Sequence, residues 1–374
     1  MSGPSLLQTA LLSWYLAHSR DLPFRNTRDP YAIWVSEIMA QQTRITALLP
    51  YFERFMRIFP DVGALAAADE HDVLKAWEGL GYYSRARCLR RAAQIVAREH
   101  GGVVPDDPAA LRRLPGVGDY TAGAILSIAY GRREPAVDGN VLRVHARIAN
   151  DDTDVTRPEA KQKARAWVYD LMPEEDVPES GGGLAAGRRP GDMTQALMEL
   201  GALVCLPKTP RCEECPAQSL CAARAAGRER SLPVKSPKKP HRVEIRPVLL
   251  LIDPEGRVYM RRRGEVLLCG LWEFPAQAPE GVEILSQTPC GQATHTFTHI
   301  KWEMEGFLCR AVQTGQPPEE AVWADAALFG TLAIPAAFRV YVELLRNRFP
   351  AFTHPRRRGF SPSVCSDTSD CRRA

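Results

Sequence analysis

The sequence predicts two differently built halves, an all-helical first half and an α+β second half, joined by a linker. Apolar residues recur at helical spacing through residues 5–170, whereas three later segments alternate apolar and polar residues as strands do. Between the halves, residues 227–242 (GRERSLPVKSPKKPHR) combine six basic residues with three prolines. The chain of 374 residues is 45% hydrophobic and 25% charged, which supplies apolar side chains for more than one core. We therefore expect a multidomain protein.

The helical half is expected to span residues 1–226. Prolines and glycines interrupt its periodicity briefly, and no convincing run of strands is evident in it. Residues 174–191 contain three consecutive glycines and predict a flexible loop, after which helical periodicity resumes at Asp192. The basic segment, residues 227–242, is either a solubilising tether or a strap that contacts phosphate.

The second half is expected to fold between residues 243 and 350. Its β-rich apolar alternation predicts three strands, at residues 246–253, 256–263 and 301–312. A final helix is expected near residues 335–348. The last residues, 351–374, are polar and predict a disordered tail.

Composition limits the compartment and the partners of the protein. No apolar run reaches the ~18 residues of a membrane span, and the N-terminal residues predict an amphipathic helix rather than a signal peptide. The net charge is only +4, so a surface for an acidic partner has to be local. Because most of the ten cysteines are scattered, a reducing, cytoplasmic compartment fits best.

Four of the cysteines are clustered. Cys205, Cys212, Cys215 and Cys221 are separated by six, two and five residues, so four thiolates can surround one metal centre. Structural zinc more often uses two close pairs, whereas only one such pair is present here. We therefore favour a [4Fe–4S] cluster, with zinc or no metal as the alternatives. The spacing also resembles the cluster loop of the endonuclease III superfamily of DNA glycosylases.

Residues 114–118 (LPGVG) join two helical patterns through a short turn. Gly116 and Gly118 have no Cβ, so backbone N–H groups there can approach an anion, aided by the positive end of the following helix. Taken alone, such a segment is more often only a turn. Together with the cysteine loop, it resembles the helix-hairpin-helix of the same superfamily, which implies contact with a DNA phosphate.

Asp138 follows an extended segment and opens a helix, so one role for it is to cap that helix. In the superfamily, an aspartate at the matching position is catalytic, and its charge would stabilise an oxocarbenium-like sugar. Asn140 would then orient this carboxylate or the substrate. Tyr120 stands where strand-cleaving members carry a lysine. Since a phenol cannot form an imine with the sugar, the resemblance implies a monofunctional glycosylase.

Glu37 lies in residues 31–43 (YAIWVSEIMAQQT), which predict a helix with one apolar face. A carboxyl on the same face as Ile33 and Trp34 loses solvation, which raises its pKa and suits it to donate a proton near neutral pH. A salt-bridged core glutamate is the alternative. The segment SEIMAQQT resembles the motif of MutY-type adenine DNA glycosylases, in which the matching glutamate protonates the flipped adenine. By this resemblance Glu37 makes the base a neutral leaving group.

Two side chains match positions that wedge into the duplex in that family. Gln42 and Tyr82 would help hold the duplex open beside the opposite base while the adenine is extruded. Core packing is the alternative for Tyr82 and Tyr83. Arg25 resembles a residue that lines the adenine pocket. A solvated basic face explains the arginines that follow equally well, and these are Arg85, Arg87, Arg90 and Arg91.

Residues 267–277 (LLCGLWEFPAQ) resemble the core of a Nudix fold, but the acidic signature that binds metal for pyrophosphate cleavage is missing. We therefore expect a non-catalytic Nudix-like module. Phe297, Thr298 and His299 match the MutY-type loop that recognises 8-oxoguanine opposite the adenine. In that family the first of the three wedges and the second hydrogen-bonds the oxidised base, where threonine replaces the common serine here. A strand with alternating aromatic and threonine residues is the alternative.

The resemblance covers residues 5–350 and implies both fold and function. It implies an all-α helix-hairpin-helix glycosylase domain with an iron–sulfur cluster loop, followed by an α+β Nudix-like domain. The implied activity is removal of adenine mispaired with 8-oxoguanine or guanine from double-stranded DNA, by a nucleoid-associated monomer. A thymine-mismatch glycosylase and a non-enzymatic iron–sulfur DNA-binding protein are the alternatives. The glycine-rich loop at 174–191, longer than the family suggests, is a departure.

Overall fold

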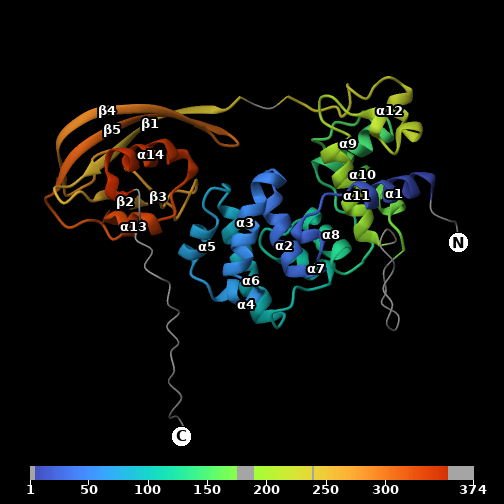
Figure 1. Ribbon diagram of the computed structural model, residues 1–374, viewed down its shortest axis with the longest axis horizontal. Coiled ribbons are helices and arrows are strands. Elements are labelled where there is room, and N and C mark those ends of the chain that lie inside the picture. Colours follow the sequence, from blue (N-terminus) through green and yellow to red (C-terminus); the bar gives the residue numbers. More distant parts are fainter. Residues whose placement is uncertain (1–4, 175–188, 238–239, 353–374) are drawn as a thin grey trace, which may run out of the picture. The chain divides into compact units, whose positions relative to one another are not determined.

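The computed structural model describes residues 5–174, 189–237 and 240–352 of the chain. Its contacts divide it into two units, with the boundary between Pro240 and His241, inside the basic segment expected to be a linker. The described residues of the first unit form only helices and irregular segments, and those of the second form one sheet with helices (Figure 1). The expected order, an all-α domain followed by an α+β domain, is confirmed.

Twelve α-helices occur among the described residues of the first unit. Their bounds are α1 (Leu6–His18), α2 (Pro30–Ala40), α3 (Ile45–Ile58), α4 (Val62–Ala67), α5 (Glu70–Ala76), α6 (Ser84–Glu99), α7 (Pro108–Arg113), α8 (Asp119–Ile128), α9 (Gly139–Ile148), α10 (Pro158–Leu171), α11 (Pro190–Leu203) and α12 (Ala222–Ala225). Across the described parts of the whole chain, no helix is both long and apolar enough to cross a membrane.

Helix α8 lies between the early and the late helices of this unit (Figure 1). It packs against α2 and α7 on one side and against α11 on the other, while α11 also packs against α1 and α9. The late helices share one core with α1, to which Leu11, Val144 and Leu197 contribute fully buried side chains. This packing brings the end of α2, the start of α8 and the start of α9 together.

Helix α11 begins at Pro190, two residues before the expected start at Asp192. Proline suits the first position of a helix because the N–H that it lacks would have no partner there. Asp192 instead accepts a hydrogen bond from the backbone N–H of Arg189 at 3.2 Å. Most of the expected glycine-rich loop (175–188) and nearly all of the expected tail (353–374) lie outside the described residues.

The first part of the expected linker packs onto the helical unit. Leu232 is buried, and its carbonyl accepts a hydrogen bond from Arg147 Nε at 2.9 Å. The carbonyl of Val234 accepts another from the N–H of Val155 at 3.0 Å. Lysine, arginine and proline dominate the composition of this segment and predict an exposed linker. One buried leucine and a few backbone hydrogen bonds cannot be recognised from such a composition.

The second unit is built on one six-stranded sheet. Its elements are β1 (Arg242–Ile252), β2 (Val258–Arg262), β3 (Trp272–Glu273), β4 (Val282–Thr296), β5 (Ile300–Gln313), β6 (Ala321–Ala324), α13 (Ala326–Thr331) and α14 (Arg339–Arg348). The strand order is β3-β2-β1-β5-β4, and β6 pairs with β2. Strands β1 and β5 are parallel, whereas the other pairs are antiparallel.

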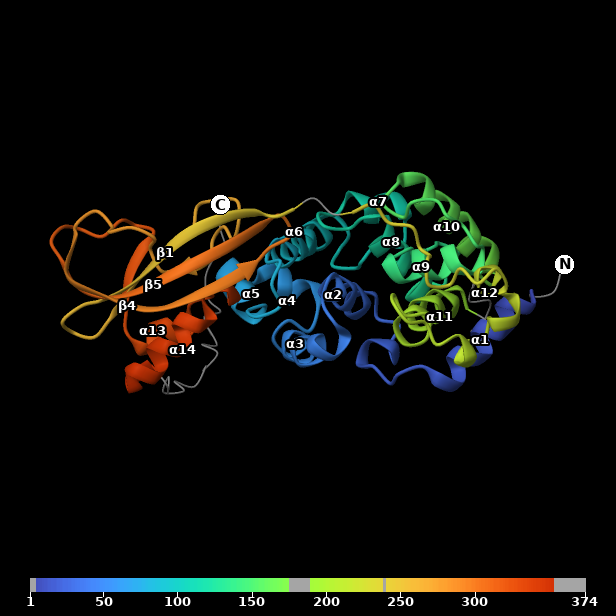
Figure 2. The ribbon, with the colours of Figure 1, turned by 90° about the horizontal axis from the view of Figure 1, so that it is seen from above.

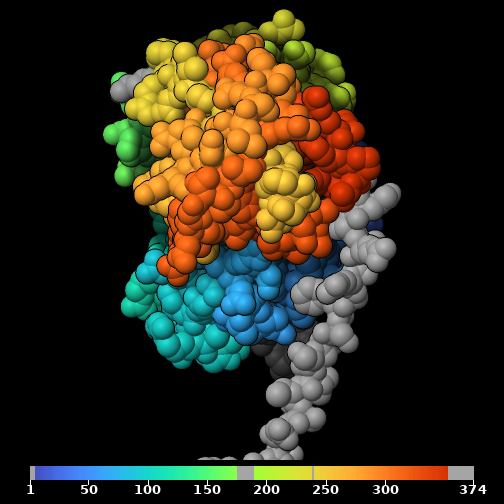
Figure 3. Space-filling view, turned by 90° about the vertical axis from the view of Figure 1, so that its left-hand side faces the viewer, coloured from blue at the N-terminus to red at the C-terminus, as the bar shows by residue number. Residues whose placement is uncertain are grey.

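The sheet buries apolar side chains on both faces. Along β1, Val248 and Leu250 belong to the core that α13 and α14 cover, while Leu249 and Leu251 belong to a smaller core on the opposite face. This explains why β1 reads as a continuous apolar run rather than as an alternation. Strands β4 and β5 form the long hairpin seen in Figure 2, and this orange part of the chain makes up much of the surface in Figure 3.

The three predicted strands correspond to β1, β2 and β5, and the predicted final helix corresponds to α14. Strand β4 was not predicted. Most of its residues are exposed, and Pro289 and Gly291 interrupt its pairing with β5 at an irregularity. Proline and glycine inside a strand are typical of edges and bulges, so the segment lacks the composition of an ordinary strand.

Candidate active site and DNA-contacting surface

Glu37 lies in the last turn of α2. Its helix neighbours Ile33, Trp34 and Ile38 are buried. Its carboxylate accepts a hydrogen bond from the hydroxyl of Tyr120 at 2.5 Å. Burial is the main cause that raises the pKa of Glu37 to about 7; the nearby charge of Asp138 acts in the same direction, and the Tyr120 hydrogen bond opposes it. The alternative of a salt-bridged core glutamate is wrong, because no ion pair forms to Glu37 among the described residues.

Tyr120 sits in the first turn of α8, directly after the glycine turn. Its hydroxyl also lies 3.9 Å from Sδ of Met198 on α11. Burial, followed by the charges of Glu37 and Asp138, raises the pKa of Tyr120 well above its usual value, so the phenol stays protonated and acts as a donor. Both Glu37 and Tyr120 keep part of their surface exposed, which leaves them accessible to a ligand.

Asp138 does cap α9, but the cap uses only one of its carboxylate oxygens. Oδ1 accepts a hydrogen bond from the N–H of Val141 at 2.8 Å, and Oδ2 accepts one from Nδ2 of Asn140 at 2.8 Å. Burial raises the pKa of Asp138, while these two hydrogen bonds lower it. The structure therefore brings Glu37, Tyr120, Asp138 and Asn140 into one site at the meeting point of α2, α8 and α9.

Asn140 is itself held by its neighbours. Arg143 Nη2 donates to Oδ1 of Asn140 at 2.9 Å, and the same guanidinium reaches the carbonyls of Gly201 at 2.7 Å and Cys205 at 2.7 Å. Helix α11 comes so close here that a Cβ on Gly201 would lie 2.6 Å from Cβ of Asn140. Arg143 thus links the Asp138 carboxylate, through Asn140, to the backbone of the first clustered cysteine.

Arg25 lies beside the site, and its partner was missed in the sequence. Arg25 Nη2 and Arg20 Nη2 each contact Oε2 of Glu199 at 2.6 Å, and the Glu199 side chain is fully buried. Burial alone would raise the pKa of Glu199, but the hydrogen bonds from Arg20 and Arg25 prevail and lower it to about 2. An acidic residue in the interior of α11, far in sequence from both arginines, gave no local signal of this triad.

The hairpin predicted at residues 114–118 connects α7 to α8. Gly116 has φ of +79°, and a Cβ there would lie 2.8 Å from Cβ of Cys88 on α6, so two constraints favour glycine. Gly118 is the N-cap of α8, and a Cβ on it would meet no atom within 4 Å. The backbone N–H groups at the start of α8 are therefore open to an anion.

Gln42 lies in the turn that follows α2, and Tyr82 lies in the turn that precedes α6. Both have left-handed backbone conformations, with φ of 57° and 49°, which are uncommon for residues other than glycine. Both side chains are exposed, 43% in the case of Tyr82, whereas the adjacent Tyr83 is buried. Core packing is therefore the correct reading for Tyr83 and the wrong one for Tyr82.

The four clustered cysteines line one small hollow, together with residues of α9 and α11. Arg147 Nη1 lies 3.3 Å from Sγ of Cys205 and also holds the carbonyl of Leu206 at 2.7 Å. Within the described part of the chain, no three His, Cys, Asp or Glu side chains are placed to hold a metal ion. The four cysteine side chains thus line a common space.

In the second unit, residues 297–299 form the turn between β4 and β5 rather than part of a strand. The N–H of Phe297 donates to the carbonyl of Ile300 at 2.8 Å, and the Phe297 ring packs edge-on against Trp302 at 4.8 Å. Thr298 and His299 are exposed at the tip. The strand alternative is wrong for these three residues.

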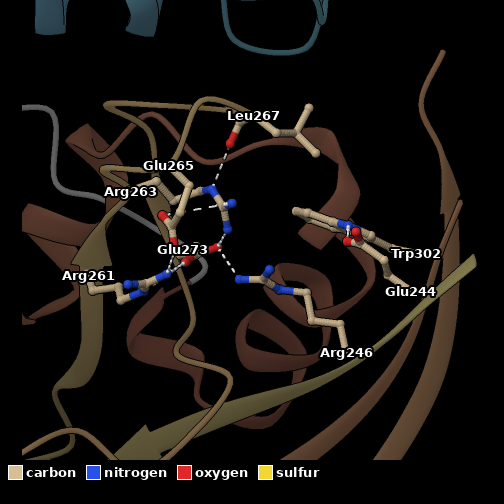
Figure 4. Close-up of polar contacts among 8 residues, drawn as sticks. All are labelled: Glu244, Arg246, Arg261, Arg263, Glu265, Leu267, Glu273 and Trp302. Carbon is tan, nitrogen blue, oxygen red and sulfur yellow. Dashed lines mark hydrogen bonds and ion pairs between the residues drawn. The ribbon is translucent and has the colours of Figure 1, made fainter. Parts of the chain in front are cut away.

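In the second unit, the fully buried carboxylate of Glu273 is neutralised by three arginines (Figure 4). Glu273 on β3 binds Arg246 at 2.7 Å and Arg261 at 2.7 Å, and also Arg263. Arg246 in turn stacks on the ring of Trp302 at 4.5 Å. With its oxygens occupied in this way, Glu273 is not available as a metal ligand.

The helical fold, with its hairpin and its paired acids, defines the class to which the first unit belongs. Residues 35–169 match the HhH-GPD superfamily of base excision DNA repair proteins, and residues 247–344 match the NUDIX domain. The solved structure of a thermostable thymine-DNA glycosylase is similar, with a TM-score of 0.51 and 26% sequence identity; the likeness covers 59% of this chain and 96% of that one.

Curated relatives narrow the class. The adenine DNA glycosylase of Homo sapiens is 31% identical over 96% of this chain and 77% of its own length. That of Mycobacterium tuberculosis is 43% identical over 61% of this chain and 71% of its own. The chain belongs to the adenine DNA glycosylase family: it is a DNA repair enzyme that acts as an adenine glycosylase in base excision repair.

Proposed function

We propose that this enzyme removes adenine mispaired with 8-oxoguanine or guanine and leaves the DNA strand intact. The observation that carries the proposal is Glu37, a buried carboxyl with a pKa of about 7 that remains accessible beside Tyr120 and Asp138. A carboxyl with this pKa is half protonated at neutral pH, which is the state a general acid needs.

Each residue of the site has a distinct task in this reaction. Glu37 donates its proton to the flipped adenine, so that the glycosidic bond breaks with departure of a neutral base. Asp138 remains ionised and stabilises the positive charge that develops on the sugar. Water then forms the new bond to C1′ of the sugar and loses a proton, which completes the hydrolysis. Asn140 and the Val141 N–H fix the direction of that carboxylate. Tyr120 fixes Glu37 by its hydrogen bond and, as a phenol, forms no imine, so the strand is not cleaved.

The DNA-contacting residues lie around this site or on the second unit. The N–H groups at Gly116 and Gly118 bind a phosphate of double-stranded DNA, which positions the duplex without reading its sequence. Gln42 and Tyr82 enter the base stack while the adenine is extruded. On the second unit, Phe297 and the Thr298 hydroxyl contact the base opposite the adenine. We expect the protein to act as a nucleoid-associated monomer.

The four clustered cysteines would hold a [4Fe–4S] cluster. The four cysteines line a single hollow, and their spacing, with only one close pair, favours a cluster over structural zinc, which more often uses two close pairs. Such a cluster supplies a covalent crosslink among segments with little core of their own. Arg143 and Arg147 of α9 both contact Cys205, and Arg143 also donates to Asn140. These contacts would connect the cysteine loop to the catalytic site.

The test is base release from matched duplexes. The protein, in excess, is incubated with duplexes carrying adenine opposite 8-oxoguanine, guanine or cytosine, and with thymine opposite guanine. We expect breaks only after alkali, in the adenine strand, fastest opposite 8-oxoguanine and guanine. Thr298→Val should reduce the preference for 8-oxoguanine over guanine, and Thr298→Ser should keep it. Release of thymine, or strand breaks without alkali, would contradict the proposal. Thymine release is the rival activity, because the chain is similar to the structure of a thymine-DNA glycosylase.

A further inference from the structure

Arg85, in the first turn of α6, is buried, so a solvated basic face, one of the explanations open for it from the sequence, does not apply. One guanidinium nitrogen, Nη1, donates to three carbonyls at the end of α2: those of Ile38 at 2.9 Å, Met39 at 2.9 Å and Gln41 at 2.5 Å. These groups belong to the last turn of a helix, where carbonyls lack partners within the helix. Arg85 therefore caps, from another helix, the helix that carries Glu37.

The other nitrogen, Nη2, reaches the turn before α6. It lies 3.1 Å from the carbonyl of Gly81, 3.4 Å from that of Leu80 and 3.4 Å from Oγ1 of Thr43. The guanidinium also lies 5.4 Å from the ring centre of Tyr82. One side chain thus touches both of the turns whose tips are Gln42 and Tyr82.

The surroundings of Arg85 suit a cation without a counter-ion. Among the described residues no carboxylate pairs with it, and its charge is met by carbonyl oxygens and by the ring of Trp77, also at 5.4 Å. The negative end of α2 adds to this. Burial lowers the pKa of Arg85 to about 10, so it stays charged at neutral pH. Only a planar group with several fixed donors can satisfy so many acceptors at once.

We propose that Arg85 is a positioning residue, which holds Gln42 and Tyr82 in their exposed left-handed conformations and fixes both to the helix of Glu37. This role rests on the proposed function, in which those two side chains enter the duplex. Left-handed conformations outside glycine persist only where the surroundings impose them. Without the guanidinium, the two turns relax independently, and opening of the duplex is no longer coordinated with presentation of the base to Glu37.

Arg85→Lys tests the proposal, because lysine keeps the charge but loses the planar set of donors. In a Glu37→Gln background, which cannot turn over, extrusion is followed by the fluorescence of 2-aminopurine placed opposite 8-oxoguanine. We expect Arg85→Lys to slow extrusion roughly tenfold, a typical size for coupled neighbours. Tyr82→Ala should slow it too, and the double variant should be no worse than the more affected single one. Arg87→Lys is the matched control, since Arg87 lies on the same helix as Arg85 but pairs with Glu70 of α5, at 3.0 Å.

The outcomes distinguish the wedge role of Tyr82 from the positioning role of Arg85. If Tyr82→Ala leaves extrusion unchanged, the wedge role in the proposed function is wrong. If Tyr82→Ala slows extrusion but Arg85→Lys does not, or if the two effects simply add, the positioning role of Arg85 is overturned. If Arg85→Lys does not fold, Thr43→Val removes one of the same contacts and should slow extrusion with an unchanged melting temperature. Normal extrusion in that variant would overturn the proposal.

Discussion

Glu37→Gln is expected to lower the single-turnover rate of adenine release by about 10²–10⁴-fold, the usual contribution of a general acid. Glutamine has nearly the same shape and still accepts the hydrogen bond from Tyr120, so DNA binding should change little. The measurement is base release from a duplex with adenine opposite 8-oxoguanine, together with binding of the same duplex. Release within a factor of three of the original rate would exclude Glu37 as the proton donor.

The same substitution should stabilise the protein in alkaline solution. The folded pKa of Glu37, about 7, is above its value of 4.5 in the unfolded chain. The folded state therefore binds the proton more tightly, and this contribution to stability is present at low pH and lost as pH rises through 7. Between pH 5.5 and 8.5, the free energy of unfolding of the variant, relative to that of the original protein, should increase by about 2 kcal/mol. Loss of activity with a gain of stability is not expected for a merely structural glutamate.

Asp138→Asn is expected to lower the rate of adenine release by about 10²–10³-fold, the typical effect of removing one preorganised electrostatic group. Asparagine caps a helix as well as aspartate does, so the N–H of Val141 keeps its acceptor and the fold survives. Rates are to be measured in single turnover, with melting temperatures beside them.

Asp107→Asn is the matched control for this variant. Asp107 caps α7 in the same way, accepting the N–H of Ala110 at 2.6 Å. Asp107→Asn should leave the rate unchanged. Equal rates for the Asp138→Asn variant and this control would reduce Asp138 to a helix cap.

The candidate site residues could be found from the sequence because each lies in a short segment that resembles a motif of a known family. Glu37 stands on an apolar helix face, Asp138 opens a helix after an extended segment, and Gly116 and Gly118 sit in a turn between helices. The structure brings these segments together, and their order along the chain is what made the family recognisable.

Other parts could not be found because their roles depend on distant partners. Arg85 looks like one arginine of a basic helix, and nothing near it in sequence indicates that the end of α2 will surround it. Glu199 meets Arg20 across 179 residues. Strand β4 is stabilised by its long pairing with β5, while its own residues are mostly exposed.

The most direct test of the account is the pH dependence of adenine release in single turnover between pH 6 and 9. If the protonated carboxyl of Glu37 starts the reaction, the rate should be highest at the acidic end and fall about tenfold per pH unit above a pKa near 7. The residual rate of Glu37→Gln should show no such fall. A rate that is constant or rises across this range in the unmodified protein would contradict the account.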